Sequence, residues 1–352
     1  MKQKRLKGDE VMKATIKDVA RAAGVSPSTV SRVASGSARI SESTKKRVKA
    51  VMQELNYKPN LLARSLVRQD SCAIAVVYDC YTKGYSQDPF FMEAMRGICQ
   101  AAQEQSLHVL ISTGADGRKG SGIASLSQSG MVRGMILLSA PVDDIPAEAL
   151  REAGLPFVEI GHPSDRSGNW VDNDNVLAGR EATETLIRKG HKRIAFVGAD
   201  GSYHYTMERL TGYREALRKA NLPIDESLII PAAGVGDKAS EDSCIKRLCG
   251  EKAPSASVCA TDDLAVWLIG TLTKHGIDVP LTMSVIGFNN SPMSRYIVPS
   301  LSTVDINAFE LGRKACDMLI DIMENPDSEV KNEIIKTTII ERDSTAGSVK
   351  GR

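Results

Sequence analysis

Histidines and cysteines are the residues of this chain best suited to bind metal ions or to act as nucleophiles, but their spacing predicts neither chemistry. The five histidines have no metal-ligand spacing, and none of the seven cysteines belongs to a Cys-x-x-Cys pair. The sequence also lacks a phosphate-binding glycine loop, the His-Glu-x-x-His motif of zinc proteases and the Gly-x-Ser-x-Gly motif of serine hydrolases. We therefore expect no catalytic residue, no metal site and no cofactor, and the chain is predicted not to be an enzyme.

Positive charge gathers at the start of the chain. Residues 1–68 hold 16 Lys or Arg and 5 Asp or Glu, a net charge of +11, whereas the whole chain carries only +2. These basic residues are interleaved with apolar residues at helical spacing, which favours a folded domain over a charged tail. A folded basic domain attached to a mildly acidic remainder is typical of a protein that binds a polyanion.

The elements that must position this charge are predicted to be three short helices. Thr15 precedes an apolar pattern at helical spacing that stops at Gly24, as expected of a helix cap and a helix end. Ser26 and Pro27 then suit the start of a second helix, and a third helix is expected over residues 43–55. Two short helices joined by a glycine-containing turn predict a helix-turn-helix.

Beyond residue 70, short apolar runs alternate with helical patterns, which predicts two similar α/β lobes with parallel sheets. The composition, 42% hydrophobic and 25% charged, is that of a globular protein. No apolar run reaches the roughly 18 residues that a membrane span needs. We therefore expect a cytoplasmic protein without a membrane partner. The predicted strands are 73–78, 109–112, 135–138, 157–160, 193–197, 257–260 and 285–288.

The basic region carries five motifs at a characteristic spacing: Ile16-Lys17-Asp18-Val19-Ala20, Gly24-Val25-Ser26, Thr29-Val30-Ser31-Arg32-Val33, Asn56-Tyr57 and Pro59-Asn60. With them, residues 14–66 resemble the DNA-binding headpiece of the lac-repressor family. The resemblance implies that the second helix enters the major groove, where Pro27, Ser28 and Arg32 would face base edges. Arg32 would bind both O6 and N7 of a guanine, the alternative being a contact with phosphate only.

The same resemblance implies phosphate contacts and a hinge helix. Hydroxyl groups and one charge would hold the headpiece on phosphates, and these belong to Thr15, Lys17, Ser26, Thr29 and Ser31. Residues 60–67 resemble a hinge helix that begins at Asn60 and binds the minor groove, with Ala63 on the groove floor and Leu66 as a wedge between base pairs. The alternative for Leu66 is a linker residue that packs on the rest of the chain.

The second part of the chain carries the motifs Glu208-Arg209-Leu210-Thr211-Gly212-Tyr213, Thr261-Asp262-Asp263-Leu264-Ala265 and Gly287-Phe288-Asn289-Asn290. From about residue 71 to 342 it resembles the two-lobed periplasmic sugar-binding fold that the family carries. The resemblance implies an effector site between the lobes, formed by Arg209, Asp262, Phe288 and Asn289. Arg209 would be the partner of Asp262 and of sugar hydroxyls, because a planar donor fork, a carboxylate and amides suit paired hydroxyls.

Further segments look closer to a subgroup of this family, the maltose-operon regulators of low-GC Gram-positive bacteria. They are Asp88-Pro89-Phe90-Phe91, Val171-Asp172-Asn173-Asp174-Asn175, residues 190–196 and residues 302–307. The subgroup implies maltose or a malto-oligosaccharide as the effector, with Asp88, Phe90 and Phe91 at the site. Phe90 would stack on a sugar ring, whereas Phe91 could instead fill the core at the start of a helix.

We therefore expect a homodimeric repressor that binds a near-palindromic operator and whose affinity for DNA changes when sugar binds. Two rivals remain: a global catabolite regulator controlled by a phosphorylated carrier protein, and a sugar-binding receptor without gene regulation. The expected segments are a flexible leader (1–13), an all-α helix-turn-helix headpiece (14–58), a hinge helix and linker (59–70), a two-lobed domain (71–343) and a tail (344–352). Lobe one would comprise 71–171 and 304–327, and lobe two 172–303 and 330–343, with chain crossings near 171–173, 302–305 and 326–330.

Overall fold

The structure is a computed structural model that describes residues 14–34, 39–57, 71–78, 89–112, 121–138, 145–198, 201, 203–231, 238–250 and 252–348. The chain divides into two compact units, Met1–Asp70 and Ser71–Arg352. Among the described residues, the first unit is helical and the second unit holds all the strands. No helix in this described part of the chain is long and apolar enough to cross a membrane.

Three helices form the described part of the first unit: α1 (Ile16–Ala23), α2 (Pro27–Ala34) and α3 (Glu42–Glu54). α1 begins at a capping box, in which the backbone N–H of Thr15 donates to the Asp18 carboxylate at 2.9 Å. It ends at Gly24, whose φ of 62° is a left-handed conformation that glycine adopts without strain. The predicted helix-turn-helix is confirmed, and each helix contributes one fully buried valine to a common core, namely Val19, Val30 and Val48.

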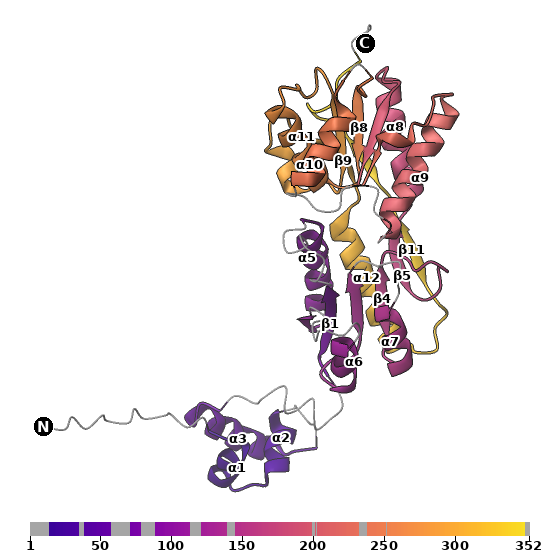
Figure 1. The fold of residues 1–352 in the computed structure, drawn as a ribbon. Coiled ribbons are helices and arrows are strands. Elements are labelled where there is room, and N and C mark those ends of the chain that lie inside the picture. Colours follow the sequence, from indigo (N-terminus) through magenta and orange to yellow (C-terminus); the bar gives the residue numbers. More distant parts are fainter. Residues whose placement is uncertain are drawn as a thin grey trace, which may run out of the picture. The chain divides into compact units, whose positions relative to one another are not determined.

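The second unit is built on two six-stranded sheets (Figure 1). In the first sheet, which defines lobe one, the strand order is β11-β5-β4-β3-β1-β2 and the strands are parallel. In lobe two the order is β12-β10-β9-β8-β6-β7, and β12 pairs antiparallel with β10. The strands of lobe one are β1 (Ala73–Tyr78), β2 (His108–Ser112), β3 (Met135–Leu138), β4 (Phe157–Ile160), β5 (Trp170–Asn173) and β11 (Asn332–Ile335). Those of lobe two are β6 (Ile194–Val197), β7 (Ile229–Ile230), β8 (Ala256–Cys259), β9 (Ser284–Phe288), β10 (Ser302–Asp305) and β12 (Thr338–Ile340).

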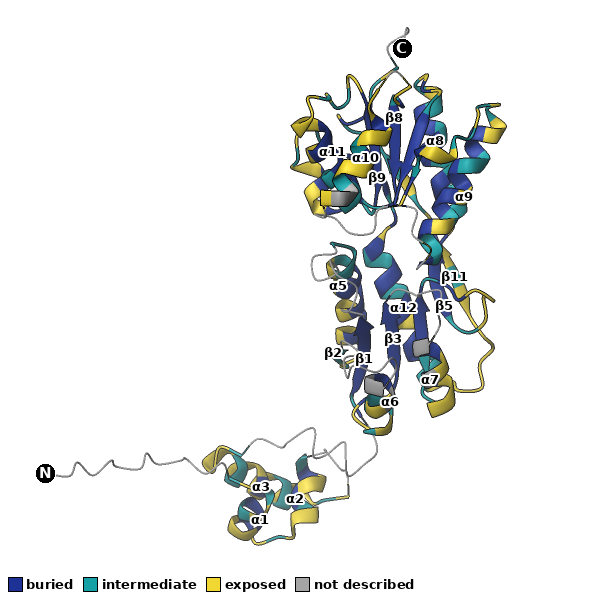
Figure 2. Cartoon of the chain, in the orientation of Figure 1, coloured by how far each residue is buried: buried dark blue, intermediate teal, exposed yellow. Residues whose placement is uncertain are grey.

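Helices cover the sheets, whose central strands are almost entirely buried (Figure 2). Alternate residues of β1 enter two different hydrophobic clusters, so both faces of the lobe-one sheet are covered. The predicted two-lobed α/β body with parallel sheets is therefore confirmed. The helices of lobe one are α5 (Pro89–Glu104), α6 (Ser121–Gln128), α7 (Ile145–Ala153) and α12 (Ala308–Glu324). Those of lobe two are α8 (Asn175–Arg188), α9 (His204–Lys219), α10 (Lys238–Leu248) and α11 (Asp262–Lys274), with short 3-10 helices η2 (Glu226–Leu228) and η3 (Pro292–Arg295).

One pair of helices in each lobe makes a close approach at facing glycines. In lobe one, a Cβ atom on Gly312 of α12 would lie 2.0 Å from a carbonyl oxygen of α5, and Gly97 of α5 meets α12 in the same way. In lobe two, Gly179 of α8 lies against the backbone of Arg209 in α9, and Gly212 of α9 lies against α8. Side chains at these positions would push the helices apart, so the glycines fix where α12 and α9 run.

The chain passes between the lobes three times. It leaves β5 of lobe one after Asn173, β10 of lobe two after Asp305, and β11 of lobe one after Ile335. The buried Asn173 side chain joins the three crossings, because its Nδ2 donates to the carbonyl oxygens of Ile306 at 3.1 Å and Ile335 at 2.8 Å. A single amide thus links the three segments that connect the lobes.

The predicted third crossing at 326–330 is wrong. β11 lies beyond those residues and pairs in parallel with β5, so it extends the lobe-one sheet, and the chain crosses only at residues 336–337. The predicted lobe limits shift accordingly, since Asp172 and Asn173 belong to the lobe-one sheet and residues 304–305 to the lobe-two sheet.

The predicted start of the tail at residue 344 is also wrong. Ser344 is buried, and its hydroxyl donates to the Val285 carbonyl of β9 at 2.6 Å. The backbone N–H of Ser348 donates to the Lys189 carbonyl at 2.8 Å. The chain is therefore packed on lobe two as far as residue 348.

Candidate functional site

The residues predicted to face base edges lie at the start of α2 and along its exposed side. Pro27, Ser28 and Arg32 are exposed, whereas Val30 of the same helix lies in the headpiece core. Ser28 and Arg32 are one helical turn apart, so they share a side of the helix. An arginine and a hydroxyl on one exposed helix side are able to donate to bases and phosphates. Their contacts with DNA stay predictions.

Two of the predicted phosphate contacts also cap helices. The Thr15 hydroxyl donates to the carboxylate three residues later at 2.6 Å, and the Ser26 hydroxyl accepts from the Thr29 backbone N–H at 3.2 Å. Thr29 is half-buried, whereas Lys17 and Ser31 are exposed. The caps define the two helix ends that would approach a phosphate. The predicted hinge residues lie outside the described part of the chain, namely Asn60, Ala63 and Leu66.

Arg209, the central residue of the predicted effector site, is buried in α9 of lobe two. Its guanidinium carbon lies 4.4 Å from the ring centroid of Phe288 and 4.9 Å from that of Tyr205. Its Nε donates to Asn175 Oδ1 at 3.0 Å, and a terminal nitrogen donates to the Ala260 carbonyl at 2.6 Å. Burial lowers the pKa of Arg209 to about 10, so the side chain is charged at neutral pH. The predicted neighbours Arg209 and Phe288 are thus in contact.

Asp262, the predicted partner of Arg209, has other hydrogen-bond donors. Its Oδ1 accepts from the Thr303 hydroxyl at 2.6 Å, and its Oδ2 accepts from the Ser291 backbone N–H at 2.7 Å. Asp262 thus has hydrogen-bond donors other than Arg209, from segments that follow β9 in the chain, and it acts on Arg209 through its charge. Burial raises the pKa of Asp262 to about 6. Asn289 is half-buried directly after β9 with a φ of 107°, and its role as an effector ligand stays a prediction.

Phe90 and Phe91 lie in the first turn of α5, and both are half-buried against the main hydrophobic cluster. The ring centroid of Phe91 lies 4.4 Å from that of Tyr78 at the end of β1. This contact favours the alternative in which Phe91 fills the core at the start of a helix. Phe90 as a platform for a sugar ring stays a prediction, and Asp88 lies outside the described residues.

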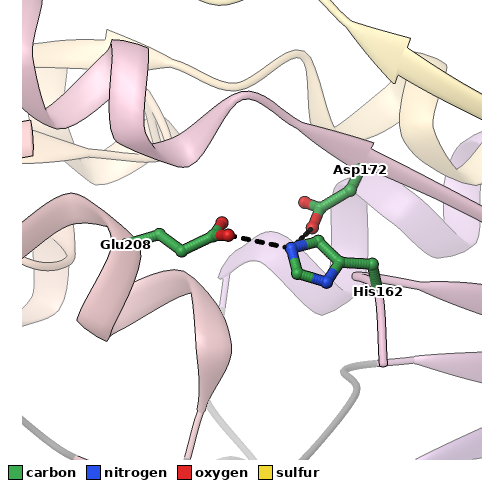
Figure 3. A group of neighbouring side chains, drawn as sticks. All are labelled: His162, Asp172 and Glu208. Carbon is green, nitrogen blue, oxygen red and sulfur yellow. Dashed lines mark hydrogen bonds and ion pairs between the residues drawn. The ribbon is translucent and has the colours of Figure 1, made fainter. Parts of the chain in front are cut away.

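A cluster that the sequence did not predict joins the lobes beside Arg209 (Figure 3). His162 follows β4 and Asp172 lies in β5, both in lobe one, whereas Glu208 precedes Arg209 on α9 of lobe two. The His162 Nε2 atom lies 3.0 Å from Glu208 Oε1 and 3.9 Å from Asp172 Oδ2. Two of the three residues stand at the carboxyl ends of neighbouring parallel strands, where the ligands of such sheets bind. Their position after predicted strands was therefore the sequence feature that could have indicated this cluster.

The cluster offers three ligand atoms that lie within 4.8 Å of one another, which is the geometry of a possible metal site. However, the Arg166 guanidinium lies 3.2 Å from Glu208 Oε1 and 3.4 Å from His162 Nε2, so a cation already stands beside these atoms. His162 Nδ1 lies 2.9 Å from the Pro163 carbonyl oxygen, and Nε2 faces a carboxylate. Each ring nitrogen has an acceptor within about hydrogen-bond distance, and the Arg166 donor lies farther from Nε2, so a protonated imidazole in an ion-pair network fits the cluster better than a metal ligand.

The electrostatics of the cluster agree with this interpretation. The hydrogen bond to Glu208 raises the pKa of His162 above its ordinary value, although burial opposes the shift. Burial works against ionisation of Glu208 too, but the bond to His162 and its charge leave the pKa of Glu208 below its ordinary value. Burial raises the pKa of Asp172 to about 6. The His162–Glu208 ion pair is thus favoured around neutral pH.

Two family models match this chain. Residues 15–60 match that of bacterial regulatory proteins of the lacI family, and residues 183–345 match that of a periplasmic binding protein-like domain. The chain is 38% identical over 322 residues to the HTH-type transcriptional regulator MalR of Streptococcus pneumoniae serotype 4, which covers 89% of this chain and 94% of the relative. The relative is named as a regulator and not as an enzyme, so the expectation that this chain is not an enzyme is confirmed.

Solved structures of other proteins have a similar fold. A complex of the transcriptional regulator CelR with cellobiose has a TM-score of 0.72 and 29% identity, and the match covers 94% of this chain and 99% of that chain. The lac repressor dimer bound to operator and the anti-inducer ONPF has a TM-score of 0.80 over 95% of this chain and 99% of that chain. Its identity of 24% makes it evidence for the fold alone.

Proposed function

This chain belongs to the lacI family of bacterial regulatory proteins, as its motifs predicted, and from that premise we propose that it represses sugar-utilisation genes and that its effector is maltose or a short malto-oligosaccharide. Membership makes the chain a ligand-responsive transcriptional repressor. The similarity to MalR and the subgroup motifs in the sequence support maltose, and the cellobiose complex of CelR supports a disaccharide. The repressor would act in the cytoplasm, where its operator lies.

The surroundings of Arg209 carry the proposal of a sugar effector. Its guanidinium lies over the rings of Tyr205 and of the fully buried Phe288, and its planar donor fork suits the paired hydroxyls of a sugar. Three carboxylates, those of Asp172, Glu208 and Asp262, act electrostatically on Arg209. They would repel a phosphate group, so the proposed ligand is an uncharged sugar.

Calorimetry tests this proposal on the wild type and on Arg209→Lys, which keeps the charge but loses the planar fork. We expect maltose or maltotriose to bind the wild type and the variant to lose about 2 to 4 kcal/mol of binding free energy, as when a charged hydrogen bond is lost from a desolvated site. A melting curve of each protein checks the fold, and cellobiose and glucose 6-phosphate serve as comparison ligands.

Each outcome decides one part of the proposal. Binding of cellobiose without maltose would reject the effector but keep the site. Unchanged maltose affinity in Arg209→Lys would reject the site. An operator affinity that no sugar changes but that a phosphorylated carrier protein does change would favour the global catabolite regulator.

We also propose that the repressor is a homodimer on a near-palindromic operator, because one helix-turn-helix reads only one half-site. Lobe two exposes large apolar side chains in one short segment, residues 293–298. Met293, Tyr296 and Val298 are exposed to 53%, 83% and 93%. Apolar side chains this exposed are typical of a surface that a partner covers, and a second copy of this chain is the proposed partner.

A further inference from the structure

Five residues form a closed ring that runs from lobe one to lobe two and back, through four side-chain contacts and the peptide bond between Glu208 and Arg209. The His162 Nε2 atom lies 3.0 Å from Glu208 Oε1, and Glu208 adjoins Arg209 on α9. Arg209 Nε donates to Asn175 Oδ1 at 3.0 Å, and Asn175 Nδ2 donates to Asp172 Oδ1 at 3.1 Å. Asp172 Oδ2 closes the ring at 3.9 Å from His162 Nε2 (Figure 3 shows the three ionisable members).

The ring is tied to firmly held elements on both sides. In lobe one, Asp172 is part of β5 and His162 stands two residues after β4, and the two strands pair. In lobe two, Gly179 of α8 lies against the backbone of Arg209, so α8 and α9 cannot shift independently. The first chain crossing lies inside the ring, between Asp172 and Asn175. A change in the angle between the lobes must therefore lengthen at least one contact of the ring.

We infer that His162 and Asp172 of lobe one are positioning residues for Arg209 of lobe two, so that the affinity of an uncharged ligand at Arg209 depends on pH. The inference rests on the proposed sugar effector for its binding measurement, but not for the exchange measurement described below. Maltose has no group that titrates between pH 6 and 9, so a pH dependence of its affinity must arise in the protein.

The sign follows from the groups that face His162. These are Glu208 and His204 on α9, Asp172 on β5 and Arg166 in the segment between β4 and β5. The carboxylate of Glu208 favours the protonated imidazole, so the ionic part of its contact with His162 is intact below the raised pKa of His162 and is lost as the pH rises through it. Because the intact ring preorganises Arg209, sugar should bind more tightly at pH 6.5 than at pH 8.5.

The first measurement needs no sugar. Exchange of the Arg209 Nε–H with water is followed by NMR at pH 6.5 on protein labelled with 15N-arginine. We expect exchange to become about tenfold faster in His162→Gln and in Glu208→Gln, because the opening of the ring is then easier. The control is Glu215→Gln, which removes another carboxylate of α9. Glu215 pairs with Arg180 at 3.5 Å within lobe two, so its loss should leave the exchange rate unchanged. Equal exchange in the wild type and in the two ring variants would overturn the inference, whatever the protein binds.

The second measurement is calorimetry with maltose and with cellobiose at pH 6.5 and 8.5. We expect the wild type and Glu215→Gln to bind about fivefold more tightly at the lower pH, and His162→Gln to show no difference. A sugar that binds the wild type equally at both pH values contradicts the inference. If neither sugar binds, the proposed effector is rejected and the exchange measurement alone decides the role of the ring.

Discussion

Arg32 and Lys17 are both exposed cations of the headpiece, yet they are assigned different roles on DNA. Arg32→Ala should cost about 1 to 3 kcal/mol on the operator and little on a scrambled duplex, because a base contact is lost. Lys17→Ala should weaken binding to both duplexes and lower the salt dependence, because only a phosphate contact is lost. Titration of fluorescent duplexes at low and high salt measures both effects. Equal losses on the two duplexes in Arg32→Ala would show that it touches phosphate only.

For single residues, the sequence predicted which side chains belong to the site better than it predicted their hydrogen-bond partners. Motifs placed Arg209 and Phe288 in one site, and the structure brings them into contact. They could not reveal that Asp262 is held by Thr303 and Ser291, because these donors stand about 30 to 40 positions away in the chain. The role of His162 could not be predicted from its motif, because its hydrogen-bond partner Glu208 comes from the other lobe.

Among the elements, the glycine contact between α5 and α12 gives a sharp test of packing. Gly312→Ala would place a Cβ atom 2.0 Å from a carbonyl oxygen of α5, so we expect it to lower the free energy of unfolding by about 1 to 3 kcal/mol. Gly270→Ala is the matched control, because Gly270 lies in α11 with no atom within 4 Å of the added Cβ, and it should stabilise by about 0.5 to 1 kcal/mol. Urea unfolding monitored by circular dichroism measures both. If the two variants change stability in the same direction, the close approach does not restrict α12.

The elements that the sequence predicted are those with a strong local pattern. The predicted strands 73–78, 135–138 and 157–160 agree to the residue with β1, β3 and β4, whose residues are almost all apolar and mostly buried. β11 was missed because it is an edge strand with exposed Asn332 and Ile334, so it has no apolar run. The third crossing was misplaced for the same reason, since only the pairing of β11 with β5 locates it.

At the scale of the whole molecule, the exposed segment 293–298 predicts how the chain assembles. Tyr296→Asp and Val298→Asp should each shift a dimer towards monomer, because a buried unpaired carboxylate is costly in an interface. Val330→Asp introduces the same charge at a valine that is 63% exposed outside the segment, and it should leave the dimer intact. Size-exclusion chromatography with light scattering gives the masses. A tetrameric wild type, or a dimer that survives both substitutions in the segment, would contradict the proposed assembly.

The three crossings also set the order in which the protein becomes complete as it is synthesised. The headpiece has a core made from residues 16–57 alone, so it is able to fold as soon as it leaves the ribosome. Lobe one must wait, because Arg313 of α12 bonds Glu104 at 3.0 Å across 209 positions, and β11 is made later still. A nascent chain thus carries its DNA-reading helices well before it holds a finished lobe, and premature termination would release a headpiece that no sugar controls.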